Sequence, residues 1–384
     1  MKVYLDNNAT TPLAEEVRKE MDEVQDSFGN PSSLHQFGVT ARNIIDTARS
    51  RVSSALGCEV NEVVFTSGGT ESDNLAIQGF LKSSKKKHII TSKVEHHAVL
   101  NLFKYLEKNG YTVSWIDVDE YGCIDPQEVV AELKDDTALV SIMMANNETG
   151  TIYPLKDITG KVKDFSSDII VHTDAVQAFG KMALDVKDIG VDMMSVSAHK
   201  INGPKGMGAL YIKKRTKVTQ LVFGGHHEKG IRPGTENVAG IAGLGKAAEM
   251  AVKDMDKKNG KLLELKNKLK KGIESNIKNV KVNGHPERCL ANTLNISFEN
   301  VEGESIIMML DMEGVGVSTG SACTSGTLES SHVLGAMGVD PVMSQGSIRF
   351  SLGKYNTEQE IDYVIEKLPP VIERLRKMSP LERG

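Results

Sequence analysis

The chain has 384 residues, 40% hydrophobic and 25% charged, which is enough for two domains or for one large domain with an appendage. Its net charge of −5, with lysine-rich stretches that alternate with acids, leaves no basic stripe, so we expect no direct binding to nucleic acid. The start MKVYLDNNATT has no apolar signal region and no run reaches membrane-spanning length, so we expect a cytoplasmic protein without a membrane partner.

Seven short β-rich runs alternate with helical stretches in the first part of the chain. They are EVVFTS (62–67), KHIITS (87–92), TVSWIDV (112–118), TALVSIMMA (137–145), DIIVHTDA (168–175), DMMSVSAH (192–199) and GALYIKK (208–214). This alternation predicts an α/β fold with a mainly parallel seven-stranded sheet that helices cover on both faces. Most runs end on polar residues, and ligands bind beyond the carboxyl ends of parallel strands, so these clusters should converge on one crevice.

After Gly234 the sequence changes to long helices, with leucine and isoleucine at helical spacing from Leu262 to Ile277. A second α/β unit follows, with strands in 292–299 and 347–353 and helices near 303–312 and 357–378, the last of which Pro369 and Pro370 are expected to break. We therefore predict a large domain at 15–250 and a smaller α/β domain at 251–384, to which the N-terminal segment 1–14 contributes.

The stretch TSGGTESDN (66–74) places a glycine turn between a predicted strand and a predicted helix, with Thr70 near the helix start. Backbone N–H groups and the positive end of a helix suit a phosphate, and the threonine adds a hydroxyl. The stretch lacks the G-K-[ST] of a Walker loop and the pattern G-x-G-x-x-G. A plain glycine turn is an equally good interpretation of these residues alone.

Two further strand ends carry an acid and a lysine. Asp174 could pair with a cationic ring nitrogen or act as an ordinary helix cap. Lys200 is a surface lysine in the simplest interpretation, but a lysine that points into a crevice is unfavourable unless it is paired or engaged, for instance as a Schiff base. A phosphate cradle, an acid and a lysine at neighbouring strand ends together favour a pyridoxal phosphate site.

Other polar residues could complete such a site. His96 and His97 form either a polar helix start or a stacking and proton-transfer group, and zinc is disfavoured because adjacent histidines diverge and no matching Cys/His set exists. Asn147 could bond a cofactor hydroxyl or a substrate carboxylate. Arg349 suits an amino-acid carboxylate, with a surface salt bridge as the alternative.

The four cysteines are far apart and form no C-x-x-C pair, so neither a disulfide framework nor a metal knuckle is indicated. Cys58, Cys123 and Cys289 are interpreted as packed or incidental thiols. Cys323 differs because it lies in GSACTSG, among small residues, where it could be a structural thiol, half of a disulfide, a metal ligand or a nucleophile.

The motifs, in their order along the chain, resemble the cysteine desulfurases of the NifS/IscS type, within the class V aminotransferase group of fold-type I pyridoxal phosphate enzymes. The likeness runs through YLDNNATT, SFGNPSSLHQFG, TSGGTESDN, EHHAVL, NNETG, HTDAVQA, SAHKINGPKG, RPGTENV, SACTSGT and IRFSLG.

The resemblance implies pyridoxal 5'-phosphate as cofactor and a role for each matching residue. Lys200 would form the Schiff base and move the Cα proton, with Asp174 on the ring nitrogen and His96 stacked on the ring. The implied ligands of the ring hydroxyl oxygen are Gln177 and Asn147, and those of the phosphate are Gly69, Thr70, Ser197, His199 and, from the second subunit of a homodimer, Thr235. Arg349 and Asn147 would hold the substrate carboxylate.

The implied reaction takes sulfur from L-cysteine and gives L-alanine and a persulfide on Cys323. A sulfur-acceptor protein, either an iron–sulfur scaffold or a tRNA-thiolation relay, would then receive the sulfur. Because a loop of small residues suits a nucleophile that travels, we expect residues near 320–330 to be poorly ordered without substrate, with Cys323 away from the ring. The motif differs from the RxGxHCA pattern of the group that includes selenocysteine lyases, which favours cysteine as substrate. A cofactor-free α/β binding module is the alternative from another class of protein.

Overall fold

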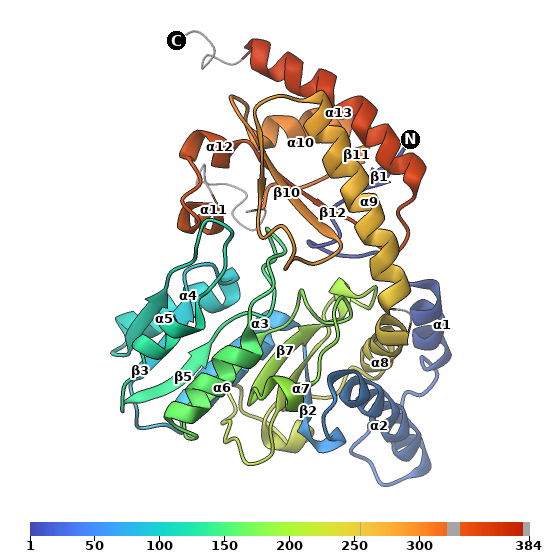
Figure 1. Ribbon diagram of the computed structural model, residues 1–384. Coiled ribbons are helices and arrows are strands. Elements are labelled where there is room, and N and C mark those ends of the chain that lie inside the picture. The colour runs from blue at the N-terminus through green and yellow to red at the C-terminus, as the bar shows by residue number, and fades with distance from the viewer. Residues whose placement is uncertain (254, 321–330, 379–384) are drawn as a thin grey trace.

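The computed structural model describes residues 1–253, 255–320 and 331–378. The described elements form two parts, a lower one around a seven-stranded sheet and an upper one around a three-stranded sheet (Figure 1). Both the N-terminus and the long last helix, α13 (Glu358–Met378), lie in the upper part.

The large sheet contains all seven predicted strands. In spatial order they are β2 (Val63–Thr66), β8 (Gly208–Ile212), β7 (Met193–Ser197), β6 (Ile170–Asp174), β5 (Thr137–Ser141), β3 (His88–Ser92) and β4 (Thr112–Ile116). Only β8 runs antiparallel to its neighbours, β2 and β7, and the other pairs are parallel. The prediction of a mainly parallel seven-stranded α/β fold is therefore confirmed.

Helices bury both faces of this sheet. Alternate residues of each strand point to opposite faces, so each set of side chains packs in a different cluster. Ile89 and Leu139 pack in one cluster with Phe103, whereas Ile90 and Val140 belong to another. The first cluster includes α3 (Gly69–Leu81) and α4 (His97–Lys108), and the second includes α1 (Glu15–Glu23), α2 (Gln36–Leu56), α5 (Pro126–Ala131), α6 (Leu155–Phe165), α7 (Val186–Ile189) and α8 (Val238–Lys253). Apolar runs buried on both sides are typical of parallel sheets.

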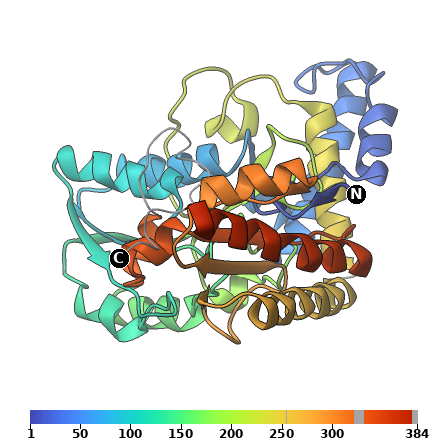
Figure 2. The same ribbon diagram turned by 90° about the horizontal axis from the view of Figure 1, so that it is seen from above.

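The upper part has its own core. Its antiparallel sheet has the order β12 (Ser347–Ser351), β10 (Thr293–Phe298) and β9 (Val280–Asn283). Helix α9 (Met255–Asn276) buries the predicted apolar stripe, and α13 runs between α9 and α10 (Gly303–Met312) in Figure 2. The N-terminal strand β1 (Val3–Tyr4) pairs in parallel with β11 (Val315–Gly316), and Val3 and Leu5 join this core. The exact domain limits stay a prediction.

Five short elements complete the described chain. They are the 3-10 helices η1 (Val60–Glu62), η2 (Ala198–Lys200) and η3 (His227–Gly230), and the helices α11 (His332–Ala336) and α12 (Pro341–Gln345). Of these, η2 directly follows strand β7, so it fixes the position of Lys200 relative to the large sheet.

The last helix contradicts one prediction, because α13 continues through Pro369 and Pro370. Each proline lacks an N–H and crowds the carbonyl one turn earlier, which normally kinks or breaks a helix. Leu368, Val371 and Ile372 flank the prolines and are buried in the upper core. The prediction of a break was wrong because tertiary packing of this apolar stripe outweighs the lost backbone bonds.

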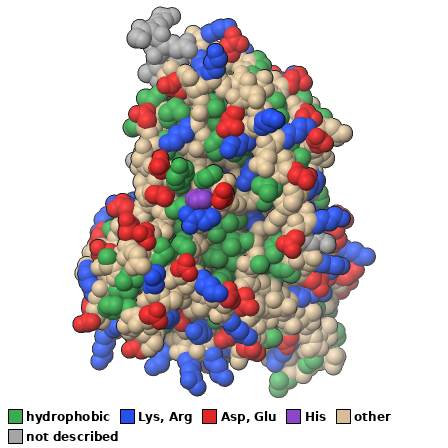
Figure 3. All heavy atoms as spheres, in the orientation of Figure 1, with side chains coloured by type: hydrophobic (Ala, Val, Ile, Leu, Met, Phe, Trp, Pro, Cys, Tyr) green, Lys and Arg blue, Asp and Glu red, His purple; other side chains and the backbone are tan. Residues whose placement is uncertain are grey.

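Charged side chains of both signs are present on the surface of the molecule (Figure 3). On the face in Figure 3, Lys and Arg side chains are interspersed with Asp and Glu, without a region of one sign. No helix in the described ranges combines the length and the apolar character needed to cross a membrane.

Candidate active site

The carboxyl ends of the large sheet meet the small sheet through Arg349. This residue lies on β12, and its Nη1 donates to the carbonyl of Asn147, which follows β5, at 2.9 Å. Asp174 and Ser197 are the last residues of β6 and β7, and His96 follows β3. The predicted convergence of strand-end residues on one region is therefore present in the structure.

The N-terminal segment joins these residues. The carbonyl of Asn8 accepts hydrogen bonds from Lys200 Nζ at 2.5 Å and from Gln177 Nε2 at 3.0 Å. The side-chain amide of Asn8 donates to the carbonyl of Asn147 at 3.2 Å, and Asp6 Oδ1 accepts from Arg349 Nη2 at 2.9 Å. Sequence reasoning gave Asp6 and Asn8 no role, and the polar run LDNNATT was the only signal for them.

Lys200 and Asp174 form the charged centre of this region. The Lys200 ammonium also donates to the carbonyl of Ala9 at 2.8 Å. Asp174 Oδ1 accepts from the backbone N–H of Val176 at 2.8 Å, and the chain continues as a turn, so Asp174 is not a helix cap. Burial raises the pKa of Asp174 to about 6, opposed by the Val176 hydrogen bond and by the charge of Lys200. A cation beside this carboxyl would therefore stabilise its ionised form.

A helix terminus and a buried hydroxyl lie together at one end of the region. Helix α3 begins at Gly69, and its first N–H groups have no acceptor within the helix. A Cβ on Gly208 would lie 2.7 Å from the Cα of Gly68, and Gly208 pairs with Ser197 across the sheet. Ser197 Oγ is buried and has no hydrogen-bond partner in the described part of the chain. These donors suit an anion.

Two of the predicted histidines, His96 and His199, are neutral at pH 7. His96 caps α4, and its Nδ1 accepts from the N–H of Ala98 at 3.2 Å, which places the proton of the neutral ring on Nε2. Burial, followed by the charge of Lys200, lowers the pKa of His96 to about 4 and that of His199 to about 4. His199 Nδ1 also contacts Thr10 Oγ1 at 3.2 Å. His96 is thus a helix start whose ring is still able to stack on a ligand.

Arg349 is buried, which excludes the alternative of a surface salt bridge. Its relative exposure is 3%, and two of its nitrogens are used by Asn147 and Asp6. Arg349 Nε and Asn147 Oδ1 are buried polar atoms with no partner among the described residues. Both atoms remain available for a ligand.

The unpartnered atoms test whether the region fits pyridoxal phosphate and an amino acid. Buried polar atoms in folded proteins nearly always have partners, so three such atoms near one strand edge indicate a ligand. Ser197 Oγ, beside the α3 terminus, fits a phosphate, and Arg349 Nε fits a carboxylate, whereas Asn147 Oδ1 is an acceptor that fits a hydroxyl or an N–H of a ligand. Asp174 fits a ring nitrogen and Lys200 an aldehyde, so the residues present fit both groups.

Two further buried acids, Asp73 and Glu95, lie near Asp174, and sequence reasoning assigned them no role. Asp73 of α3 is buried, and its polar neighbours are the Ser195 hydroxyl and His172 Nε2, which lies 3.6 Å away. Burial, then the charges of Asp174 and Glu95, raise the pKa of Asp73. Burial raises the pKa of Glu95 to about 8. Asp73 was visible in TSGGTESDN, but nothing in that sequence shows its proximity to Asp174.

Other predicted residues are exposed or lie outside the described ranges. Thr70 is exposed at the start of α3, and Thr235 is exposed between η3 and α8. Cys323 and the segment expected to be poorly ordered fall in 321–330, outside the described residues. Cys58, Cys123 and Cys289 are free thiols. Across the described ranges, no group of three or more His, Cys, Asp and Glu side chains is arranged for a metal ion.

Comparison with known proteins places the chain in a family. The family model for class-V aminotransferases matches residues 3–364. The chain is 50% identical to a cysteine desulfurase IscS of Dictyoglomus turgidum, covering 100% of this chain and 97% of that protein. It is 49% identical to a cysteine desulfurase IscS of Methanosarcina thermophila, covering 99% and 94% respectively. A solved structure of a NifS-like protein superposes with a TM-score of 0.93 at 40% identity, covering 98% of this chain and 100% of that one. Because the match includes every strand that carries the site, the chain belongs to the class-V aminotransferase family.

Proposed function

We propose that the chain is a cysteine desulfurase that uses pyridoxal 5'-phosphate to convert L-cysteine to L-alanine, with sulfur carried as a persulfide on Cys323. The observation that carries the proposal is the placement of Lys200 and Asp174 beside unpartnered buried donors, Ser197 Oγ and Arg349 Nε, that fit a phosphate and a carboxylate. The relatives named above, which bear this activity in their names, support it.

The residues divide the work of binding and proton transfer. Bound pyridoxal phosphate supplies an electron sink for the substrate Cα. Asp174 holds the ring nitrogen protonated, and Ser197, His199, Gly69 and Thr70 hold the phosphate. Gln177 and Asn147 bond the ring hydroxyl oxygen, and His96 stacks on the ring. Lys200 removes the proton from Cα. Its hydrogen bonds to the carbonyls of Asn8 and Ala9 hold its side chain at the carboxyl ends of the strands.

The substrate is held through its carboxylate by Arg349, together with Asn147. The Cys323 thiolate then attacks the sulfur of L-cysteine, so that a sulfur–sulfur bond forms and the carbon–sulfur bond breaks. The electron pair of the broken bond stays on the carbon fragment, which takes up a proton and leaves as L-alanine. The persulfide passes to a thiol of an acceptor protein, an iron–sulfur scaffold or a tRNA-thiolation relay, in the cytoplasm.

A homodimer is part of the proposal, because Thr235 of the partner would reach the phosphate. Large apolar side chains are exposed near this residue in two segments: Phe28, Leu34 and Phe37, and Val222 and Phe223. Residues 30–32 and 226–229 line one cavity of about 700 Å³, so the two segments lie side by side (Figure 2). An exposed apolar surface of this kind is typical of an interface.

Mass spectrometry after incubation with L-cysteine tests the function. We expect one extra sulfur on the Cys323 peptide of the wild type. Cys323→Ala should lose sulfur release, whereas Cys58→Ala, which removes a partly exposed thiol elsewhere, should keep it. Lys200→Ala should lose the visible absorbance of bound pyridoxal phosphate.

Two results would contradict this function. Unchanged sulfur release from cysteine by Cys323→Ala would favour a selenocysteine or cysteine-sulfinate lyase on the same fold. Purified protein that stays colourless with added pyridoxal phosphate would favour a cofactor-free binding module.

A further inference from the structure

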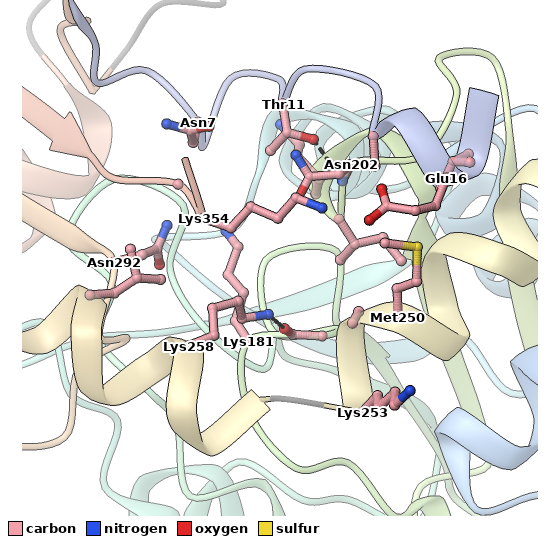
Figure 4. A pocket seen from close by; sticks show the side chains of 18 of the residues that line it. Asn7, Thr11, Glu16, Lys181, Asn202, Met250, Lys253, Lys258, Asn292 and Lys354 are labelled. Carbon is pink, nitrogen blue, oxygen red and sulfur yellow. Dashed lines mark hydrogen bonds between the residues drawn. The ribbon is translucent and has the colours of Figure 1, made fainter. Parts of the chain in front are cut away.

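A cavity of about 970 Å³ lies between the two parts of the molecule, next to the candidate active site (Figure 4). Its lining comes from the N-terminal segment, α1, the ends of α8 and α9 that face each other, and the loop after β12. Lys200 reaches its wall, but His96, Asp174, Ser197 and Arg349 do not line it. It is therefore a separate compartment that adjoins the proposed cofactor site.

The cavity has a strong excess of positive charge. Eight lysines line it, against two glutamates, Glu16 and Glu249. Glu249 is already paired with Lys246 at 2.8 Å. Figure 4 shows Lys181, Lys258 and Lys354 gathered on one side, away from Glu16. Among the described residues, no carboxylate lies within 4.0 Å of these three ammonium groups. The positive charge on this side is therefore not balanced by the chain itself.

The ammonium groups of Lys181 and Lys258 donate only to neutral oxygens, and that of Lys354 lies over the Tyr355 ring, 4.8 Å from the ring centroid. Lys258 Nζ donates to the carbonyl of Gly180 at 2.5 Å, and Lys181 Nζ donates to Gln177 Oε1 at 2.6 Å and to Asn8 Oδ1 at 2.9 Å. Burial, followed by the charge of Lys354, lowers the pKa of Lys258 to about 8. Burial, then the charges of Lys200 and Lys258, lower the pKa of Lys181. Partly buried like charges repel each other, and an anion would relieve that repulsion.

We propose that this cavity binds a small organic phosphate, whose phosphate oxygens are held by Lys181, Lys258 and Lys354. The volume is at the upper end of that of small-molecule sites and larger than an inorganic ion needs. Apolar side chains such as Met250 and Leu262 also line the cavity and offer a surface for the organic portion. Lys181 also bonds Gln177 and Asn8, so an occupant touches the network that holds Lys200.

Calorimetric titration with sodium pyrophosphate, as a probe for the phosphate groups, tests the proposal. The full-length protein with bound cofactor is titrated at constant ionic strength, and we expect saturable binding. The double variant Lys258→Gln, Lys354→Gln should bind at least about tenfold more weakly, because each lysine supplies a charge-assisted hydrogen bond. The matched control Lys271→Gln changes the same charge on an exposed position of α9 and should bind like the wild type.

Thermal unfolding gives a second measurement that does not depend on activity. Pyrophosphate should raise the melting temperature of the wild type and of Lys271→Gln, but not that of the double variant. The proposal is wrong if the wild type shows no saturable binding up to about 10 mM pyrophosphate. It is also wrong if the double variant binds as tightly as the wild type, because the probe then occupies another site. If the wild type does not bind pyrophosphate and the double variant has a higher KM for L-cysteine, the cavity is instead an entrance for the substrate.

Discussion

Glu95 shows how burial sets the charge of a single side chain near the candidate active site. Its Oε1 accepts from Ser92 Oγ at 2.6 Å and from the Met143 N–H at 3.1 Å, whereas Oε2 is buried without a partner in the described chain. Burial raises its pKa to about 8, although both hydrogen bonds oppose the shift. At neutral pH this carboxyl is therefore mostly protonated, which keeps a second negative charge away from Asp174.

The raised pKa of Glu95 predicts a loss of stability with rising pH. In the unfolded chain the pKa is about 4.3, so between that value and about 8 the folded state binds more protons, and its stability falls as pH rises. Glu95→Gln keeps the acceptor atom but does not ionise. Thermal unfolding at about pH 5 to 9 should show the wild type losing stability relative to Glu95→Gln until about pH 8 and no further above it. Glu264→Gln, at an exposed position, should follow the wild type, and parallel curves for Glu95→Gln would contradict the assignment.

Arg349 is expected to recognise the substrate carboxylate through geometry as well as charge. Arg349→Lys keeps the charge but loses the planar fork that reaches Asn147, Asp6 and a ligand together. We expect kcat/KM for L-cysteine to fall about ten- to hundredfold, mostly through KM. Steady-state kinetics measures this, with Arg374→Lys on the exposed side of α13 as the control. Equal kinetic constants for Arg349→Lys and the wild type would assign Arg349 to structure alone.

The sequence predicted some site residues and missed others for a physical reason. Asp174 ends β6, and Lys200 ends the short helix η2 that follows β7, and the rule for parallel sheets places such residues at one edge. Asp6 meets Arg349 across 343 positions of the chain, and Asn8 meets Gln177 across 169. Contacts between segments so far apart depend on how the two parts pack, and no local pattern encodes that.

At the scale of elements, local patterns were reliable where they agreed with burial. The β-rich runs became strands because both faces of the sheet are covered, and the leucine spacing from Leu262 to Leu269 became the buried stripe of α9. The predicted break of α13 at Pro369 and Pro370 was wrong. The steric and hydrogen-bond rules for proline take no account of the apolar core against which this helix packs. Local propensity therefore decided the outcome only where tertiary packing did not oppose it.

Replacing one of these prolines should stabilise the protein. Pro370 is exposed, and Pro370→Ala restores an N–H that bonds the carbonyl of Glu366. We expect the free energy of unfolding to rise by about 1–2 kcal/mol, since the gain in helix propensity of about 3 kcal/mol is partly offset by a more flexible unfolded chain. Urea unfolding measures the change. Leu368 lies on the buried side of the same helix, so Leu368→Ala should instead lower the free energy of unfolding by about 2–5 kcal/mol. Destabilisation by Pro370→Ala would show that the helix is not continuous there.

The molecule as a whole exposes apolar side chains beside Thr235 that a single chain does not cover. Phe28 and Phe37 stack with ring centroids 5.2 Å apart, and Phe37 and Phe223 are 61% and 78% exposed. Thr235 is exposed on a loop, where a second chain can contact it. A homodimer would bury the apolar surface and bring the threonine of one chain to the phosphate of the other.

Charge at this surface should weaken the proposed homodimer. Phe37→Glu or Phe223→Glu would place a carboxylate in the proposed apolar interface, and we expect the dimer Kd to rise at least about a hundredfold. Light scattering over a concentration series measures the Kd. Met312→Glu changes an even more exposed apolar residue, at 86%, on α10 away from both segments, and should leave the dimer intact. Because Thr235 would leave the phosphate with the partner, the monomeric variants should also bind pyridoxal phosphate more weakly. A wild type that is monomeric, or variants that stay dimeric while Met312→Glu dissociates, would place the interface elsewhere.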